Sequence, residues 1–198
     1  MKEETKDKPV MMYIHGFMSG SNGTKREQLE EQYGEKYRIV VPELDADPDS
    51  SLAKINKIIR EEDPEIIIGT SLGGWMTIMA ESGDRRLVIV NPCMDPFREL
   101  SICVDEELEY YCPRLDGVQT YVLRQETLDK YKKYDVEETV KKKASHIQAL
   151  CSNKDELLAT RHIDALKPLL PEEQLTVKDD FEHRCHGAGL QHLFELIG

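Results

Sequence analysis

Short apolar runs recur along the chain, and each one ends at a glycine, a proline or a polar residue. Six runs have this form: Val10–Ile14, Arg38–Pro42, Glu65–Ile68, Arg86–Val90, His146–Cys151 and Gln174–Val177. They lack the polar alternation of a strand that faces water on one side. Runs of this kind are typical of strands covered on both faces, as in a parallel sheet. We therefore expect six strands in one mostly parallel sheet.

Segments with helical spacing lie between these runs. Leu52–Glu61 carries apolar residues three and four positions apart, and Ser50 or Ser51 is a candidate N-cap. Leu72–Ser82 has a similar apolar face, and Gly83 is the expected C-terminal stop. The alternation predicts an α/β fold with a compact, doubly wound sheet of about six strands and helices on both faces. A length of 198 residues suits a single domain.

Two segments depart from this rhythm. Residues 93–143 contain no clear strand, carry Pro96 and Pro113, and include a long polar helix candidate near Arg124–Lys143. They are interpreted either as a small cap inserted over the carboxyl edge of the sheet or as an irregular crossover with its helix. Residues 1–9 are mostly charged and are expected to form a solvated N-terminal tail.

The charge balance argues against a nucleic-acid partner. The chain has 26 Lys and Arg against 38 Asp and Glu, a formal net charge of −12, which repels phosphate backbones. The densest basic stretch comprises Lys130, Lys132, Lys133, Lys141, Lys142 and Lys143. Acidic residues interleave with it, which favours a solvated helix surface over a binding patch.

Hydropathy and cysteine usage indicate a cytoplasmic protein without a membrane partner. The longest unbroken apolar run is Val10–Ile14, whereas a spanning helix needs about 20 residues. The first residues lack the apolar core of a secretory leader. The five cysteines are an odd number with no C-x-x-C pair, so we expect reduced thiols rather than a disulfide framework.

One short motif carries a chemical signal. Ser71 lies in Gly69-Thr70-Ser71-Leu72-Gly73, a G-x-S-x-G match between a predicted strand and a predicted helix. A nucleophile elbow requires this strand–turn–helix setting, with small neighbours and a helix N-terminus beside the developing negative charge. Ser71 is therefore a candidate nucleophile. The alternative interpretation is a glycine-rich turn that packs tightly or binds a phosphate.

A serine nucleophile needs a base and an orienting acid, which follow it in chain order on such a fold. Asp155 comes just after the fifth predicted strand and is the favoured acid. The adjacent Glu156 is a fallback, and Asp95 after the fourth strand is a second alternative. Four histidines follow Asp155: His162, His183, His186 and His192. His162 and His192 fall in helix-like runs, whereas spacing leaves His183 and His186 open as the base.

The oxyanion hole and the pocket have candidates near the first and third strands. The backbone N–H of Leu72 and that of Phe17, in the loop after the first strand, are the expected donors. His15 in the same loop is interpreted as structural. Met18 and Trp75 are candidates for an acyl pocket, with ordinary core residues as the alternative.

These residues together resemble the α/β-hydrolase superfamily and, more narrowly, the YqiA-like family of small esterases. The resemblance rests on Tyr13–Ser21, Gly69–Gly74, Val90–Pro92 and the late Asp and His. The family ends in a Gly-Gly-x-His-aromatic pattern with a catalytic histidine, and Phe181–Gly187 is the nearest match. It sets His183 on the catalytic position and His186 second, although paired glycines and an aromatic residue of the pattern are replaced here.

The resemblance implies hydrolysis of a small carboxylic ester or thioester through an acyl-enzyme on Ser71. His183 would be the base and Asp155 its orienting acid, with no cofactor and no metal. An amidase or C–C hydrolase of the same superfamily, and a non-catalytic binding protein on the same scaffold, stay as alternatives. A metal site on His183, Cys185 and His186 is a further option, with spacing that suits zinc poorly. The sequence leaves the substrate and the oligomeric state open.

Overall fold

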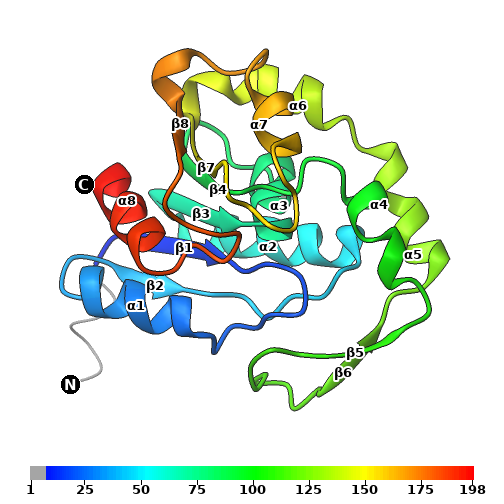
Figure 1. Cartoon of the computed structure of the whole chain (residues 1–198). Helices are drawn as coiled ribbons and strands as arrows, with labels where there is room; N and C mark the ends of the chain where they lie inside the picture. The colour runs from blue at the N-terminus through cyan, green and yellow to red at the C-terminus, as the bar shows by residue number, and fades with distance from the viewer. Residues whose placement is uncertain (1–7) are drawn as a thin grey trace, which may run out of the picture.

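A six-stranded parallel sheet organises residues 8–198, which are the residues that the computed structural model describes; most of the expected tail lies outside them. The strand order is β2-β1-β3-β4-β7-β8, and every neighbouring pair is parallel (Figure 1). The bounds are β1 Val10–Ile14, β2 Arg38–Val40, β3 Ile66–Thr70, β4 Arg86–Val90, β7 Ile147–Ser152 and β8 Leu175–Lys178. The prediction of about six parallel strands is confirmed.

The strands have apolar side chains on both faces because helices cover both. Met11 and Tyr13 of β1 face one layer of buried side chains, whereas Met12 and Ile14 face the other. The first layer is completed by α1 (Thr24–Tyr33) and α8 (Ala188–Ile197). The second is completed by α2 (Pro48–Glu62), α3 (Leu72–Met79), α6 (Val136–Lys143) and α7 (Arg161–Leu166). Burial on both sides explains the continuous apolar runs.

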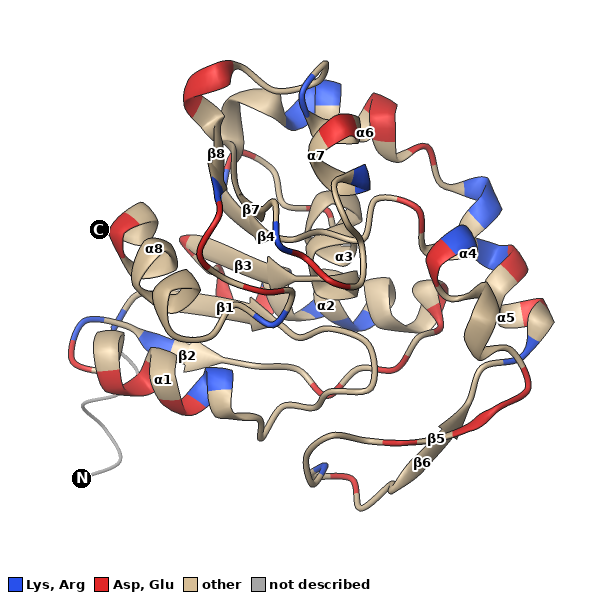
Figure 2. Ribbon diagram, in the orientation of Figure 1, with Lys and Arg blue, Asp and Glu red and all other residues tan. Residues whose placement is uncertain are grey.

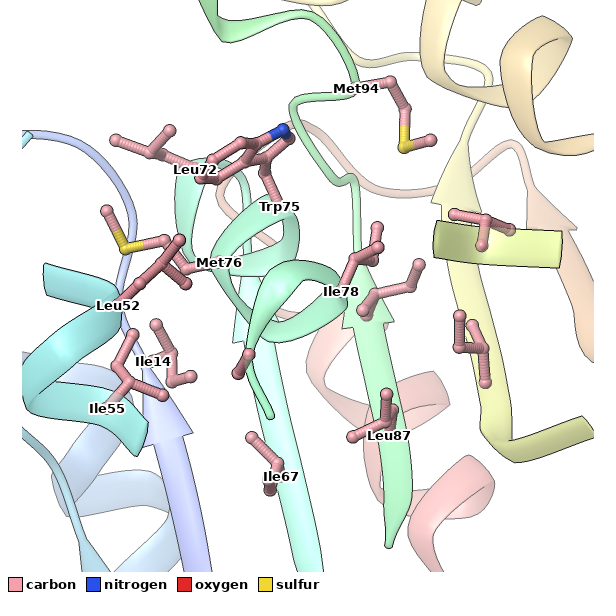
Figure 3. Close-up of a cluster of buried hydrophobic side chains, with 14 of the residues drawn as sticks. Ile14, Leu52, Ile55, Ile67, Leu72, Trp75, Met76, Ile78, Leu87 and Met94 are labelled. Atoms are coloured by element: carbon pink, nitrogen blue, oxygen red, sulfur yellow. The ribbon is translucent and has the colours of Figure 1, made fainter. Parts of the chain in front are cut away.

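Helix α3 lies at the centre of the second layer. Figure 3 shows its side chains among those of α2 and the strands: Leu72, Trp75, Met76 and Ile78 of α3 with Ile14, Leu52, Ile55, Ile67 and Leu87. Truncating one fully buried side chain of this size to Ala costs about 2–5 kcal/mol. This packing holds the first turn of α3 rigidly above β3.

Two helix boundaries differ from the predicted ones. Helix α2 begins at Pro48, and the Asp47 carboxylate accepts the backbone N–H groups of Asp49 at 2.9 Å and Ser50 at 3.3 Å. The prediction of Ser50 or Ser51 as the cap is wrong, because Asp followed by proline at the first helical position is a stronger start signal. Helix α3 ends at Met79, earlier than Ser82.

Residues 93–143 contain both a strand pair and helices, which are α4 (Pro96–Glu99), η1 (Ser101–Cys103), β5 (Glu107–Glu109), β6 (Thr120–Val122), α5 (Gln125–Asp129), η2 (Lys130–Lys133) and α6. The expectation of no strand is wrong, since β5 and β6 form an antiparallel hairpin that projects from the body (Figure 1). Its strands are only three residues long and contain no buried residue, so they give no signal like that of the longer strands of the sheet.

The long helix expected near Arg124–Lys143 is divided. Tyr134 is extended between η2 and α6, and the Asp135 carboxylate accepts the Glu138 N–H at 2.9 Å as a new N-cap. Helix α6 packs against α3 and serves as the crossover between β4 and β7. The two remaining short turns are η3 (Ala144–His146) and η4 (Glu172–Gln174).

Four of the six lysines in the basic stretch of this region pair with carboxylates. Its ion pairs are Lys130–Asp47, Lys132–Asp129, Lys133–Asp49 and Lys142–Glu138. Figure 2 shows the acidic and basic positions of α6 next to each other on one helix. Over residues 8–198, no helix combines the length and the apolar character needed to cross a bilayer.

Candidate active site

Ser71 occupies a sharp turn between β3 and α3. Its φ is 55° and its ψ is −122°, a backbone conformation that non-glycine residues seldom adopt. Neighbouring backbone holds it there: the Ser71 N–H donates to Val90 O at 3.0 Å, and Ser71 O accepts the N–H groups of Gly74 and Cys93, each at 2.9 Å. The turn thus places the Ser71 side chain at the carboxyl edge of the sheet.

The glycines of the motif allow strand and helix to approach closely. A Cβ on Gly73 would overlap the carbonyl oxygens of Ile14 and His15, and one on Gly69 would overlap Thr77 Oγ1 and Gly73 O. At both positions there is space only for the hydrogen atom that glycine carries in place of a side chain. These contacts are the physical reason for the G-x-S-x-G spacing.

The loop after β1 lies directly beside Ser71. A Cβ built on Gly16 would be 3.2 Å from Ser71 Cβ and 3.7 Å from Ser71 Oγ. Strands β1 and β3 are neighbours, and the chain order reverses between them, which is where open parallel sheets bind ligands. Phe17 and Leu72, the expected oxyanion donors, follow these two strands.

His15 has a structural setting in this loop. It is buried, its Nδ1–H donates to Gly16 O at 3.0 Å, and its Nε2 accepts the Leu44 N–H at 3.3 Å. Burial lowers the pKa of His15 below its usual value, which keeps the ring neutral and able to accept. Nδ1 therefore bonds within the loop after β1, and Nε2 connects this loop to the loop after β2.

Asp155 and His183 form a buried hydrogen-bonded pair. His183 Nδ1 lies 2.7 Å from Asp155 Oδ2, and the two side chains are 8% and 0% exposed, respectively. Asp155 Oδ1 accepts the N–H groups of Leu157 at 2.9 Å and Leu158 at 2.7 Å. Burial acts to raise the pKa of Asp155, but the His183 hydrogen bond and charge and the Leu158 N–H hold it below its usual value. The ionised carboxylate only accepts, so His183 Nδ1 carries the proton.

The alternative acids contact other groups. The Glu156 carboxylate accepts the backbone N–H of His183 at 2.9 Å, so it holds the histidine's main chain rather than its ring. The Asp95 carboxylate caps α4 by accepting the Arg98 N–H at 3.1 Å. Of the three candidate acids, Asp155 alone bonds to the ring of His183.

The other late histidines have different surroundings. His186 is exposed, and its ring bonds to no carboxylate in the described part of the chain. His192 on α8 pairs with Asp180 at 3.0 Å. His162 on α7 is 1% exposed, and neither of its ring nitrogens has a partner within residues 8–198. Burial lowers the pKa of His162 to about 4, so the ring is neutral at pH 7.

A pocket lies between the loop after β1, the first turns of α3 and the β5–β6 hairpin. It is lined by His15, Gly16, Phe17, Met18, Leu44, Asp45, Ala46, Leu72, Met76, Tyr110 and Tyr121. Its cavity volume is about 10 Å³, which is room for about one water molecule. Phe17 and Leu72 both line it, so the expected oxyanion donors border the pocket.

One of the two expected pocket residues lines the pocket, and two tyrosines of the hairpin were not expected there. Met18 lines the pocket, whereas Trp75 is 1% exposed and lies in the core. Trp75 packs edge-on against Tyr131 at 4.9 Å and Tyr134 at 5.2 Å between ring centroids, which corrects its assignment to the pocket. Tyr110 and Tyr121 come from the hairpin, and no local signal in the sequence marks them.

The hairpin is held over the pocket by a buried ion pair. Arg114 lies 3.4 Å from the Glu43 carboxylate, donates to Leu44 O at 2.6 Å and covers the ring of Tyr110. The Tyr111 N–H donates to Met18 O at 2.8 Å. These bonds connect the hairpin to the loops after β1 and β2, so the pocket wall has a defined position.

Solved structures with a similar fold include several hydrolases. Est1E from Butyrivibrio proteoclasticus has a TM-score of 0.69 and 17% identity, covering 99% of this chain and 91% of its own. The esterase domain of a Rhodothermus marinus protein has 0.66 and 14%, covering 97% and 86%. The monoacylglycerol lipase of Paleococcus ferrophilus has 0.64 and 14%, covering 96% and 94%. At these identities the likeness shows the α/β-hydrolase fold.

Sequence comparison assigns the family. A search of curated protein sequences found no significant match. The model of the uncharacterised protein family UPF0227 matches residues 10–196, which is nearly the whole chain. The match covers the strand–turn–helix around Ser71 and the loops that carry Asp155 and His183. The chain therefore belongs to family UPF0227, the YqiA-like family, and has the α/β-hydrolase fold.

Proposed function

We propose that this protein is a serine hydrolase that cleaves a carboxylic ester or thioester through an acyl-enzyme on Ser71. The observation that carries the proposal is the buried His183–Asp155 pair, at 2.7 Å, on the same sheet edge as the strained Ser71 turn. The similar structures include an esterase domain and a monoacylglycerol lipase, which supports ester cleavage as the reaction class.

In the proposed first step, His183 takes the proton of Ser71 Oγ as the oxygen attacks the substrate carbonyl. Asp155 accepts the Nδ1–H, which leaves Nε2 as the basic nitrogen, and this nitrogen bonds to no other described residue. The negative carbonyl oxygen accepts the N–H groups of Phe17 and Leu72, aided by the N-terminus of α3. His183 then protonates the departing alcohol or thiol.

In the second step, water replaces the leaving group. His183 Nε2 accepts a proton from this water while its oxygen attacks the acyl carbon, and Ser71 Oγ leaves with the proton that His183 returns. The products are a carboxylic acid and regenerated Ser71. The ionised Asp155 stabilises the imidazolium in both steps.

The small pocket beside Phe17 and Leu72 is the proposed site for the first atoms of the acyl group, next to its carbonyl. Its walls combine polar and apolar groups, with Tyr110 and Tyr121 on the hairpin side and Asp45 among the lining residues. A carboxylate at this place disfavours anionic acyl groups. One similar structure is described as ferulic acid bound to Est1E, so aromatic acyl esters belong in the substrate panel.

A fluorophosphonate probe tests the nucleophile. We expect labelling of the wild type and none of Ser71→Ala, with the modified peptide identified by mass spectrometry. Ser101→Ala, which changes an exposed serine, is the matched control and should label like the wild type. Labelling of Ser71→Ala would contradict the assignment. A panel of p-nitrophenyl esters and acyl thioesters, varied in the acyl part, then measures the preferred bond and chain.

A further inference from the structure

Asn91 lies at the end of β4, between the elbow and the loop of His183. It is 0% exposed, and its φ of 41° is in the left-handed region, which Asn tolerates better than most residues. Its backbone N–H donates to Leu150 O at 3.0 Å, so it extends the pairing of β4 with β7. A buried amide at such a position needs partners at both its donor and its acceptor.

The side-chain amide of Asn91 has a partner at both its donor and its acceptor. Its Oδ1 accepts the Ser152 N–H at 2.8 Å, and its Nδ2 donates to His183 O at 3.1 Å and to Glu182 O at 3.4 Å. One end of the amide thus bonds to the last residue of β7, three positions before Asp155. The other end bonds to the main chain of His183 itself.

The residues on either side of Asn91 hold the nucleophile. The Ser71 N–H donates to Val90 O at 3.0 Å, and the Cys93 N–H donates to Ser71 O at 2.9 Å. Residues 90–93 therefore contact the backbone of Ser71 and, through Asn91, the backbone of His183. No other side chain within residues 8–198 bonds to the carbonyl of His183.

We propose that Asn91 is a positioning residue whose amide sets the location of His183 relative to Ser71 and Asp155. The inference rests on the proposed serine-hydrolase function and deepens it. An aspartate has the same shape but presents a second acceptor to the His183 and Glu182 carbonyls, and the repulsion moves the histidine loop. A displacement of about 1 Å at a reacting group costs on the order of 100-fold in rate.

The loop that carries His183 has other hydrogen bonds, which limit how far it can move when Asn91 is changed. Lys25 Nζ donates to Cys185 O at 2.6 Å, Glu156 accepts the His183 N–H at 2.9 Å, and the Ser152 hydroxyl donates to Phe181 O. These contacts come from α1 and from the end of β7 and the loop after it. Because they persist when Asn91 is changed, we expect the variants to fold with a shifted His183.

The test compares Asn91→Asp and Asn91→Ser with the wild type and Asn56→Asp. Asn56 on α2 accepts the Glu81 N–H through its Oδ1, which an aspartate retains, so this control makes the same chemical change away from the site. The hydrolysis rate is measured with the best p-nitrophenyl ester of the panel. It is divided by the concentration of active enzyme, which titration with the fluorophosphonate gives. We expect kcat to fall about 100-fold in both Asn91 variants with KM within about twofold, and no change in Asn56→Asp.

A second readout is independent of turnover. The downfield proton resonance of His183 Nδ1–H, assigned by its loss in His183→Gln, should shift or broaden in both Asn91 variants and stay unchanged in Asn56→Asp. The inference is overturned if Asn91→Asp folds and has the same resonance and the same kcat as the wild type. It is also overturned if neither Asn91 variant folds. Absence of labelling at Ser71 would instead overturn the proposed function, and the resonance would still decide the role of Asn91.

Discussion

His183 Nδ1 and Asp155 Oδ2 lie 2.7 Å apart, although 28 positions separate the two residues in the chain. The pair forms because β7 and β8 are parallel neighbours, so the loops after their carboxyl ends meet at one edge of the sheet. Asp155 is fixed in turn by the Leu157 and Leu158 N–H groups. The order of the strands in the sheet therefore brings His183 and Asp155 together.

Asp155→Asn tests the orienting role of this carboxylate. The amide keeps the shape but can donate to Nδ1, which stabilises the tautomer that carries its proton on Nε2 and cannot accept from Ser71. We expect kcat to fall by about 10⁴-fold at an unchanged KM. Turnover of the best ester substrate measures this. Asp95→Asn, on the alternative acid, should retain activity; the reverse pattern would assign the acid to Asp95.

His162 makes the stability of the protein depend on pH. Its folded pKa of about 4 lies below the ordinary 6.5, so between these values the unfolded state binds an extra proton and stability falls as the pH falls. The full loss from pH 6.5 to 4 is on the order of 3 kcal/mol. Asp155 also has a lowered pKa, but its contribution to stability is lost only below about pH 4. The pH ranges in which His162 and Asp155 affect stability are therefore separate.

Urea unfolding at pH 7 and pH 5 measures this contribution. His162→Leu removes both unpartnered ring nitrogens, and we expect its stability to change less between the two pH values than that of the wild type. Ile163→Val changes a buried residue next to His162 that does not titrate, so it is the control and should keep the wild-type dependence. An equal dependence in His162→Leu would assign the titration to another group.

Gly73→Ala tests the close packing of the elbow. The added methyl group would overlap Ile14 O and His15 O, both backbone atoms, so either the helix or the loop after β1 must move. We expect a loss of about 3 kcal/mol or more in unfolding free energy and a loss of labelling at Ser71. Gly23→Ala adds a methyl group at ordinary contact distances and serves as the control. Full labelling of a stable Gly73→Ala would contradict the packing argument.

Tyr121→Ala tests the pocket wall contributed by the hairpin. Removing the ring enlarges the pocket, so the ratio of kcat/KM for long to short acyl chains should rise by about tenfold, since each added methylene in an apolar pocket contributes about 1 kcal/mol. A p-nitrophenyl ester series measures the ratio. Tyr111→Ala changes an exposed residue of the same insertion and should leave it unaltered. An unchanged ratio in Tyr121→Ala would place the acyl group elsewhere.

Much of the fold was predictable because its signals are local. All six strands of the sheet were predicted to within about two residues at each end, since burial on both faces leaves continuous apolar runs. The hairpin β5–β6 was not, because its strands have three residues each and none of these residues is buried. Helix α6 was predicted as part of a longer helix, since the break at Tyr134 depends on the Asp135 cap and on packing against α3.

The sequence by itself determined the strand–turn–helix at Ser71, because glycine spacing and a buried strand are features of adjacent residues. Which late histidine bonds to Asp155, the core location of Trp75 and the contacts of Asn91 depend on the tertiary structure, although the family resemblance already favoured His183. Each depends on which loops meet at the carboxyl edge of the sheet, and strand order sets those meetings over separations of tens of residues. His183 bonds to Asp155 while His186, three positions later, lies exposed.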